Sequence, residues 1–460
     1  MSVMAPQDAT MYWLSKRTRN DLFLLYCFAD RGRPTEQLRA AVAERSARIT
    51  DLCLRLRELP ADVDYPFWTR CEFGAEQFVE HQLAEPNWSH LLEVLGNLLG
   101  TGVDAAVHAW RLHVFRSVAD APGMAEEPAL VVVLQMSHAL ADGRRASALA
   151  RALFSGPDAA VVRDRSRPGS VASDGVLIAS ALGLLRMPTR LSATVVRGYH
   201  AFQAQQRLAR LTEAGELPPP GPDFPPSVLN RSAAEGVRRN EARILVFPAD
   251  DLRVPGRTVT VVVLTAVSLA LARYLADRGE PPQRLGAQVP MALPDPTASR
   301  NNYRNLGVDL FVDEPDLCLR ADKIAAALAD RRVRARHPLL SAQDRVTATV
   351  PAPMLRRDVD RFPLDAVPGS IAGHTVVSSV DRGPADFSFG GGDVRFTAGF
   401  PALGSVMHLT HGVHGLGDTV TISLHADPGV LPDIDAYAAR LRAALLEARR
   451  TRLDSAAPPV

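Results

Sequence analysis

The chain has 460 residues, of which 47% are hydrophobic and 22% charged, a balance that is typical of globular proteins and excludes disorder along the whole length. Because one hydrophobic core rarely organises this many residues, we expect two domains. Lysine and arginine total 52 against 51 acidic residues, so the basic excess that nucleic-acid binding needs is absent.

Cysteine usage and the apolar segments indicate the compartment. The four cysteines include no C-x-x-C pair, which favours a reduced, cytosolic environment. Residues 1–11 contain Asp8 and no apolar run, so they do not predict a signal peptide. The longest apolar stretch, residues 175–185, is shorter than the ~20 residues that a spanning helix needs. We therefore do not expect this stretch to make the protein an integral membrane protein. Binding at a membrane surface is left open.

The first third of the chain mixes helix and strand patterns. Residues 34–48 predict a helix, because a proline opens them and apolar residues follow at helical spacing. Residues 109–118 and 129–136 predict strands. The second of these is a continuous apolar run of strand length, as expected for a strand covered on both faces. It ends next to His138, and a helix is expected over residues 143–154.

Loop signals dominate the middle of the chain. Residues 155–173 are rich in Gly, Pro, Asp and Arg and predict a loop. Residues 176–211 have helical periodicity, with Pro188 as a break. The proline-rich segment 217–226 must be extended. We therefore expect three parts: an N-terminal domain (residues 1–156), a helical and proline-rich linker (157–226) and a C-terminal domain (227–460).

The second half predicts alternating strands and helices, followed by short strands. The expected elements are strand 242–248, helix 258–278, strand 284–291, helix 317–336, strands 375–380, 393–398, 406–410 and 419–424, and helix 432–450. The last strand alternates cleanly, with Val420, Ile422 and Leu424 on one face and Thr421 and Ser423 on the other. No internal sequence repeat is visible.

The segment from Ser137 to Gly143 carries the chemistry. His138 lies just past the buried strand, and Asp142-Gly143 opens a helix four residues later. We expect Asp142 to hold the turn through an arginine or backbone N–H groups, and Gly143 to permit a close approach at the helix start. Because an unperturbed imidazole has a pKa of about 6.5, neutral His138 can take a proton from a hydroxyl as a general base. The bare motif is weak, since any strand-to-helix turn can carry it by chance.

Other patterns favour structural roles. His408, His411 and His414 are spaced by three residues, which on a strand point to opposite faces, so we expect no metal site. The arginine cluster at residues 331–336 ends a helix, where the helix dipole favours cations. Binding of coenzyme A phosphates or of an anionic membrane by this cluster remains the alternative. The three glycines at residues 390–392 predict a hairpin turn.

Around the histidine motif the sequence resembles the bacterial wax ester synthase/acyl-CoA:diacylglycerol acyltransferase (WS/DGAT) family. That family has His-His-x-x-x-Asp-Gly after a buried strand, and its second histidine, the base, corresponds to His138. Further weak matches follow in the same order over nearly the whole chain: Ala5-Pro-Gln-Asp-Ala-Thr-Met-Tyr, Tyr65-Pro-Phe-Trp-Thr-Arg-Cys-Glu-Phe, Val289-Pro-Met-Ala-Leu, Asn301, Asn305-Leu-Gly, Val377-Ser-Ser-Val-Asp-Arg-Gly-Pro, Phe400-Pro-Ala-Leu-Gly, Gly415-Leu-Gly-Asp and Asp427-Pro-Gly-Val-Leu-Pro-Asp.

The resemblance implies an α/β fold of two chloramphenicol-acetyltransferase-like domains, with mixed sheets flanked by helices, around a tunnel. Acyl-CoA and an acceptor alcohol, a diacylglycerol or a fatty alcohol, would enter from opposite ends, meet at His138 and give triacylglycerol or wax ester. The implied site residues are His138, Asp142 and Gly143. Acyl-CoA is then a substrate, and no separate cofactor is implied. The expected location is the cytosol, with association to the inner face of the membrane or to a lipid droplet left open.

The sequence departs from the family's pattern at several positions. Ser137 replaces the first histidine, Thr260-Val261 replaces the Asn-Asp pair that opens the long helix, and Ser379 replaces the asparagine of the Ser-Asn-Val-Pro-Gly-Pro motif. Two hypotheses therefore stay open. One is an O-acyltransferase with His138 as general base, and the other is a non-catalytic lipid-binding or scaffolding paralogue with a degenerate site.

Overall fold

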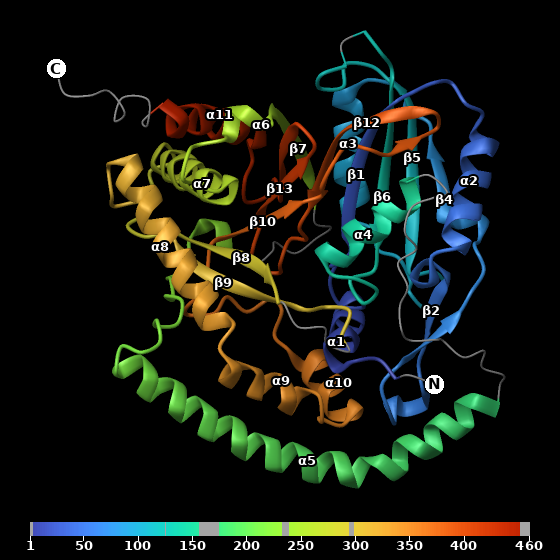
Figure 1. The fold of residues 1–460 in the computed structure, drawn as a ribbon, viewed down its shortest axis with the longest axis vertical. Coiled ribbons are helices and arrows are strands. Elements are labelled where there is room, and N and C mark those ends of the chain that lie inside the picture. Colours follow the sequence, from blue (N-terminus) through green and yellow to red (C-terminus); the bar gives the residue numbers. More distant parts are fainter. Residues whose placement is uncertain (1–2, 125, 156–173, 232–238, 294–298, 451–460) are drawn as a thin grey trace.

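Two mixed β-sheets, each flanked by helices, form the protein. The structure is a computed structural model, and it describes residues 3–124, 126–155, 174–231, 239–293 and 299–450. In Figure 1 the first sheet stands on the right and the second on the left, and one long helix passes beneath both. The mixed α/β architecture that the sequence predicts is confirmed.

Sheet 1 has the strand order β11-β12-β1-β6-β5-β4. Its strands are β1 (Leu22–Ala29), β4 (Phe78–His81), β5 (Trp110–Val118), β6 (Ala129–Met136), β11 (Ser388–Phe389) and β12 (Gly392–Phe400). The helices and the small two-stranded sheet beside it are α1 (Pro6–Ser15), α2 (Thr35–Ala47), α3 (Trp88–Leu99), α4 (Gly143–Phe154), β2 (Leu54–Arg57) and β3 (Phe67–Arg70).

Sheet 2 has the order β7-β14-β13-β10-β8-β9. Its strands are β7 (Glu241–Pro248), β8 (Gly286–Ala292), β9 (Tyr303–Asp309), β10 (Thr375–Asp381), β13 (Leu409–Leu416) and β14 (Thr419–Ala426). The remaining helices are α5 (Asp174–Glu213), α6 (Ala249–Leu252), α7 (Val259–Ala276), α8 (Leu317–Ala335), α9 (Ser341–Thr347), α10 (Ala352–Arg361) and α11 (Ile434–Arg450).

Strand β6 lies between two hydrophobic cores, as its unbroken apolar sequence predicts. Val132 and Leu134 face the core that α1, α2 and α4 cover, whereas Val131 and Val133 face the core beneath α3. All eight residues of β6 are buried. The strand that carries the motif is therefore held rigidly from both sides.

Sheet 1 is not built from the first half of the chain alone. β12 crosses over from the second half and pairs antiparallel with β1, with Phe23 opposite Phe400. The glycines before it form the predicted hairpin turn, in which Gly390 and Gly391 have φ angles of 64° and 83°. The domain limits at residues 156 and 226 stay a prediction, but residues 388–400 lie in the sheet of the other half.

The polar face of β14 binds the free edge of β12. The Thr421 hydroxyl donates to the Thr397 carbonyl at 2.5 Å, and the Ser423 hydroxyl donates to the Gly399 carbonyl. The opposite face of β14 packs into the core of sheet 2. The alternation that the sequence predicts for this strand therefore reflects a seam between the two sheets and not contact with water.

Two expectations from the sequence need correction, and some strands were missed. α5 is continuous through Pro188, because the exposed proline lies on the outer side of a bowed helix, where one missing hydrogen bond is tolerated. The strand expected from residue 406 begins only at Leu409. Strands β1 and β9 were not predicted, although β1 is a continuous apolar run. The loop expected at residues 155–173 lies outside the described residues, except for Ser155.

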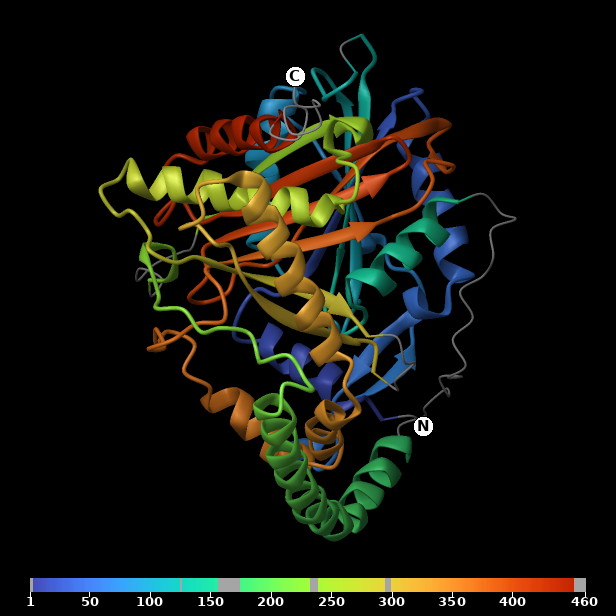
Figure 2. The ribbon, with the colours of Figure 1, turned by 60° about the vertical axis from the view of Figure 1, so that its left-hand side comes forward.

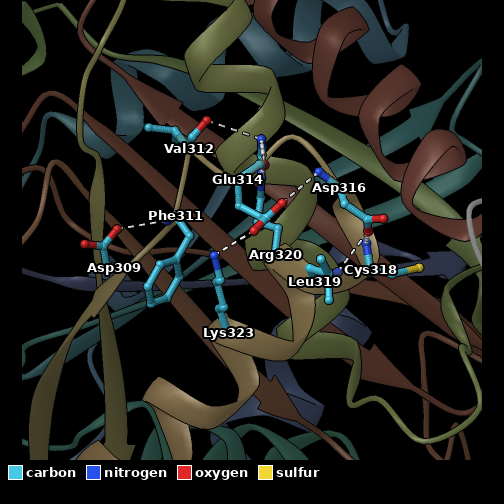
Figure 3. A network of polar contacts seen from close by, with 9 residues as sticks. All are labelled: Asp309, Phe311, Val312, Glu314, Asp316, Cys318, Leu319, Arg320 and Lys323. Atoms are coloured by element: carbon cyan, nitrogen blue, oxygen red, sulfur yellow. Dashed lines mark hydrogen bonds and ion pairs between the residues drawn. The ribbon is translucent and has the colours of Figure 1, made fainter.

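Helix α8 begins in a network of hydrogen bonds and ion pairs (Figure 3). The Asp316 carboxylate accepts hydrogen bonds from the N–H groups of Cys318 and Leu319, and it thereby caps the helix. Arg320 is only 4% exposed, and its guanidinium donates to the carbonyls of Glu314 and Val312. From this start α8 packs along β9 and ends close to where β9 begins.

Candidate active site

His138 lies in the turn between β6 and α4. The turn is tied to β5 because the Ser137 N–H donates to the Ala109 carbonyl at 2.9 Å. It closes on itself through a bond from the Leu140 N–H to the Ser137 carbonyl. The strand-to-helix turn predicted from the sequence is thus present, with α4 beginning at Gly143.

Asp142 holds this turn through backbone N–H groups. Its Oδ1 accepts from the Arg145 N–H at 2.9 Å, which caps α4, and its Oδ2 accepts from the Asn302 N–H at 3.1 Å. The second bond ties the turn to a loop of the other half of the chain. The expected role of Asp142 in holding the turn therefore agrees with the structure.

The close approach expected at Gly143 is not made by neighbouring protein groups. Among the described residues, no atom lies within 4 Å of a Cβ built on Gly143, which is exposed. The glycine is therefore not required by a close approach of neighbouring protein groups.

Asn301 determines which nitrogen of His138 carries the proton. Its Nδ2 donates to the His138 carbonyl at 2.8 Å and to the Asp8 carboxylate at 2.9 Å, so its Oδ1 must be the acceptor for the ring. The His138 Nδ1–H donates to this oxygen at 2.7 Å. Nε2 then carries the lone pair. This is the tautomer that a base acting through Nε2 needs.

Asp8 of α1 holds the loop that carries Asn301. Its carboxylate accepts from the N–H groups of Arg300 and Asn301 and from the Ser299 hydroxyl, at 2.9, 3.0 and 2.7 Å. Asp8 is 1% exposed, and burial raises its pKa, whereas these donors oppose the rise. The N-terminal helix thus positions a loop from the second half, and that loop positions the histidine.

A second carboxylate strengthens the same junction. Asp51 forms ion pairs with Arg300, at 2.7 Å, and with Arg145 of α4, at 2.6 Å. Arg300 also lies over the Trp68 ring. The turn, the loop and the N-terminal segment are therefore connected as one polar unit.

The environment keeps His138 neutral. Burial lowers the pKa of its imidazole, and the bond to Asn301 and the charges of Asp142 and Asp8 only partly oppose this. No described residue forms a hydrogen bond with Nε2, and the Tyr303 ring lies 5.9 Å away, centroid to centroid. The unprotonated nitrogen is free to accept a proton at neutral pH.

A cavity of about 650 Å³ begins at this polar unit. Asn301, Asn302 and Tyr303 line one part of it, and Arg190 of α5 and Arg345 of α9 line another. Cavities of roughly 300–1,000 Å³ are typical of small-molecule sites. Two residues that contact His138, Asn301 and Tyr303, therefore line a space large enough for a substrate.

The sequence pointed to Asp8 and Asn301 only as members of matched segments, without assigning them to the site. Two positions at which the sequence departs from the family's pattern also contact each other in the structure. The Thr260 hydroxyl at the start of α7 donates to the Ser379 hydroxyl of β10 at 3.0 Å. The substituted positions thus contact each other and keep a bond between helix and strand.

The three histidines spaced by three residues do not converge. His408 bonds with Asp427, His411 contacts the Tyr437 hydroxyl at 2.7 Å, and His414 faces Arg382. Burial lowers the pKa of His411 to about 4. Within the part of the chain that the structure describes, no group of His, Cys, Asp or Glu side chains is arranged to hold a metal ion.

The arginine cluster binds the proline-rich segment. Arg334 donates to the Pro218 carbonyl at 2.7 Å, and Arg331 donates to the Pro219 carbonyl. Arg336 lines the cavity next to Tyr303. Two of the four arginines thus hold the linker against the end of α8.

With this geometry in place, known structures identify the fold. The wax ester synthase/diacylglycerol acyltransferase from Marinobacter aquaeolei VT8 superposes with a TM-score of 0.62 at 17% identity, covering 99% of this chain and 100% of that one. The starter condensation domain of rhizomide synthetase RzmA, in complex with C8-CoA and Leu-SNAC, gives 0.57 at 14% identity, covering 99% and 95%. No protein-family model and no curated protein matches the sequence.

A third neighbour extends the comparison. The TRI3 trichothecene 15-O-acetyltransferase from Fusarium sporotrichioides gives a TM-score of 0.55 at 13% identity, covering 97% of this chain and 94% of that one. The fold is therefore that of two chloramphenicol-acetyltransferase-like halves, as predicted. It is shared with a WS/DGAT enzyme over the full length of both chains.

Proposed function

We propose that this protein is an O-acyltransferase that moves an acyl group from coenzyme A to an alcohol, with His138 as general base. The observation that carries the proposal is the tautomer of His138. Asn301 accepts the Nδ1 proton and leaves the Nε2 lone pair without a hydrogen-bond partner among the described residues. Asn301 and Tyr303, which both contact His138, line a cavity of about 650 Å³. The shared fold with acyltransferases supports the same reaction class.

The residues can perform the reaction without a covalent enzyme intermediate. Nε2 of His138 takes the proton of the acceptor hydroxyl while that oxygen attacks the thioester carbonyl. The tetrahedral intermediate then collapses, the carbon–sulfur bond breaks, and the imidazolium returns the proton to the leaving thiolate. A C–O bond replaces a C–S bond, and His138 is restored. Asn301 keeps the ring in place through both proton transfers.

We further propose long-chain acyl-CoA as donor and a diacylglycerol or fatty alcohol as acceptor. This rests on the likeness to the WS/DGAT enzyme and on the ordered motif matches. The cavity also presents apolar surface from Met4, Tyr65 and Leu293. Such substrates reside in lipid, so we place the protein in the cytosol, at the inner face of a membrane or at a lipid droplet.

The competing hypothesis is a non-catalytic paralogue. It draws on Ser137, which is buried where the family has a histidine. The Ser137 hydroxyl accepts from the Ala139 N–H at 3.3 Å, so it supports the turn instead of facing a substrate. Turnover by the native protein decides between the two hypotheses.

The test is thiol release from palmitoyl-CoA with hexadecanol or diacylglycerol as acceptor. We expect measurable turnover by the native protein and a loss of about a hundred- to ten-thousand-fold in His138→Ala with the fold retained. His425→Gln is the matched control, because this buried histidine bonds Pro401 and Asn240 at the seam and not at the site. Turnover of His138→Ala within a few-fold of native would refute the assignment.

A further inference from the structure

Helix α5 presents an apolar face to solvent. Of the seventeen large apolar side chains that are exposed in the described part of the chain, ten belong to this one helix. The most exposed are Leu177, Leu185 and Val195, each at 74%. A contiguous exposed apolar surface on a soluble domain marks an interaction site.

The face is free of charge. At 3.6 residues per turn, the outward side of α5 between Leu177 and Phe202 carries aliphatic, aromatic and small polar residues. The three arginines of this described stretch lie on the side next to the body, where Arg186 and Arg197 are still exposed to solvent. Arg190 pairs with Asp64 at 3.2 Å, and Arg197 donates to the Arg345 carbonyl at 3.0 Å. The charged residues therefore attach α5 to the body of the protein, and the apolar residues remain exposed to solvent.

The inner face fastens α5 to both halves of the molecule. A Cβ at Gly183 would lie 2.9 Å from the Asp64 side chain, so the helix approaches the first half closely there. Ala201 and Ala204 pack against Ala342 of α9 in the second half. α5 is thus held along the surface, and it is not a detached arm.

The length and composition of α5 are compatible with lipid. Two described helices are long and apolar enough to cross a membrane, and they differ in burial. In α7 the apolar window is 72% buried, as in a core helix, whereas in α5 it is 6% buried. Because α5 is fastened along one side, it suits a position in the plane of a lipid surface better than a position across it.

Shape and charge favour lipid over a second protein. In Figures 1 and 2 α5 is the outermost element at the lower end of the molecule, and it bows with its convex side outward. Two convex helices meet over a short length, which disfavours the contact of roughly 1,000 Å² that a stable interface needs. Beyond the apolar face, the exposed Arg207 and Arg210 lie near the end of α5, and these two cations complement anionic headgroups.

We propose that α5 docks the protein onto an anionic lipid surface, with its apolar face in the headgroup region. The cavity that Asn301 lines reaches the inner side of this helix, because Arg190 of α5 and Ser341 and Arg345 of α9 also line it. We therefore infer that a lipid alcohol enters the cavity at the end that α5 and α9 line. This last step rests on the proposed function, whereas the docking itself does not.

The test is flotation with vesicles of phosphatidylcholine alone or with phosphatidylglycerol. We expect the native protein to float with the mixed vesicles and more weakly with phosphatidylcholine. The triple variant Leu185→Gln, Val195→Gln and Tyr199→Gln should bind at least about tenfold more weakly. The matched control carries the same change at three exposed apolar residues of α8 and α11, Leu319, Val333 and Leu446, and should bind like the native protein.

A second readout separates docking from catalysis. With hexadecanol in mixed vesicles the triple variant should release less thiol than native, whereas with a water-soluble short alcohol the two should match. Vesicle binding by a protein that turns over no acceptor would leave docking supported and refute the proposed function. Native protein that stays unbound, a triple variant that binds like native, or a dimer in solution that the triple variant dissociates would overturn the docking proposal.

Discussion

The two halves of the molecule share a framework but differ at one turn. Strands β1-β6-β5-β4 of sheet 1 and β7-β14-β13-β10 of sheet 2 have the same order, and in both sets the last pair is parallel and the others antiparallel. In the first half the turn after β6 carries His138. In the second half the corresponding turn after β14 carries Asp427 and no histidine.

The central strands also differ in what covers them. β6 is apolar on both faces because helices cover both sides of sheet 1. β14 alternates because its polar face donates to the carbonyls of β12. One copy of the framework therefore carries His138, and the other supplies the seam that joins the two sheets.

The two turns differ in how they are held. Asp427 contacts the His408 imidazole and accepts from the Gly429 N–H, all within the second half. Asp142 and His138 are bound by Asn302 and Asn301, which belong to the opposite half. The candidate site is thus assembled only when both halves are docked, and the following changes test this difference.

The largest effect after loss of His138 itself is expected for Asn301→Ala. Without the amide oxygen the ring can take the wrong tautomer, so we expect kcat to fall about a hundredfold. Asn302→Ala is the matched control, because it keeps the backbone N–H that binds Asp142, and it should stay within a few-fold of native. Equal losses in both variants would mean that the loop acts through packing alone.

The paired variants Asp142→Asn and Asp427→Asn compare the two turns directly. Each removes a carboxylate that holds a turn, at a cost of about 1–2 kcal/mol, so both should lower the melting temperature by a few degrees. Only Asp142→Asn should also lower turnover. An unchanged melt with lost turnover in Asp142→Asn would instead make Asp142 a direct partner in the chemistry.

Ser137→His tests the family's first histidine. The Ser137 hydroxyl already accepts from the turn's backbone, so we expect the native protein to be competent and the variant to change the rate by no more than about tenfold. Ser137→Ala serves as the control for the lost hydroxyl. A native protein without measurable turnover, with turnover appearing only in Ser137→His, would favour the non-catalytic paralogue.

The smallest effect is on pH dependence. Because burial lowers the pKa of His138, kcat/KM should rise with pH through an acid limb below about pH 6.5 and stay flat at neutral pH. The Asn301 bond raises this pKa, so Asn301→Ala should move the limb to still lower pH. Rate profiles of the native protein and of Asn301→Ala between about pH 5 and pH 8 measure the acid limb of each. An acid limb that moves to higher pH in Asn301→Ala would contradict the assigned cause.

Local sequence determined the elements whose signals are contained in one segment. The apolar run of β6 and the Asp142 cap predict the strand, the turn and helix α4 with the bounds that the structure has. The ordered motif matches predicted the fold of two similar halves, and they placed His138 in the turn. The strand, the turn and the helix depend on neighbours within a few residues, where periodicity and capping are readable. The fold of two similar halves was implied by the resemblance over nearly the whole chain.

Only the tertiary structure decided how distant segments complete the site. Asp8, His138 and Asn301 are joined by hydrogen bonds across 293 and 163 positions of sequence, and no periodicity records such contacts. The position of β12 in sheet 1 is also decided by tertiary structure. This strand pairs with the edge of β1, and its carbonyls accept from the polar face of β14. α5 stays helical through Pro188 because packing on both halves offsets a local break.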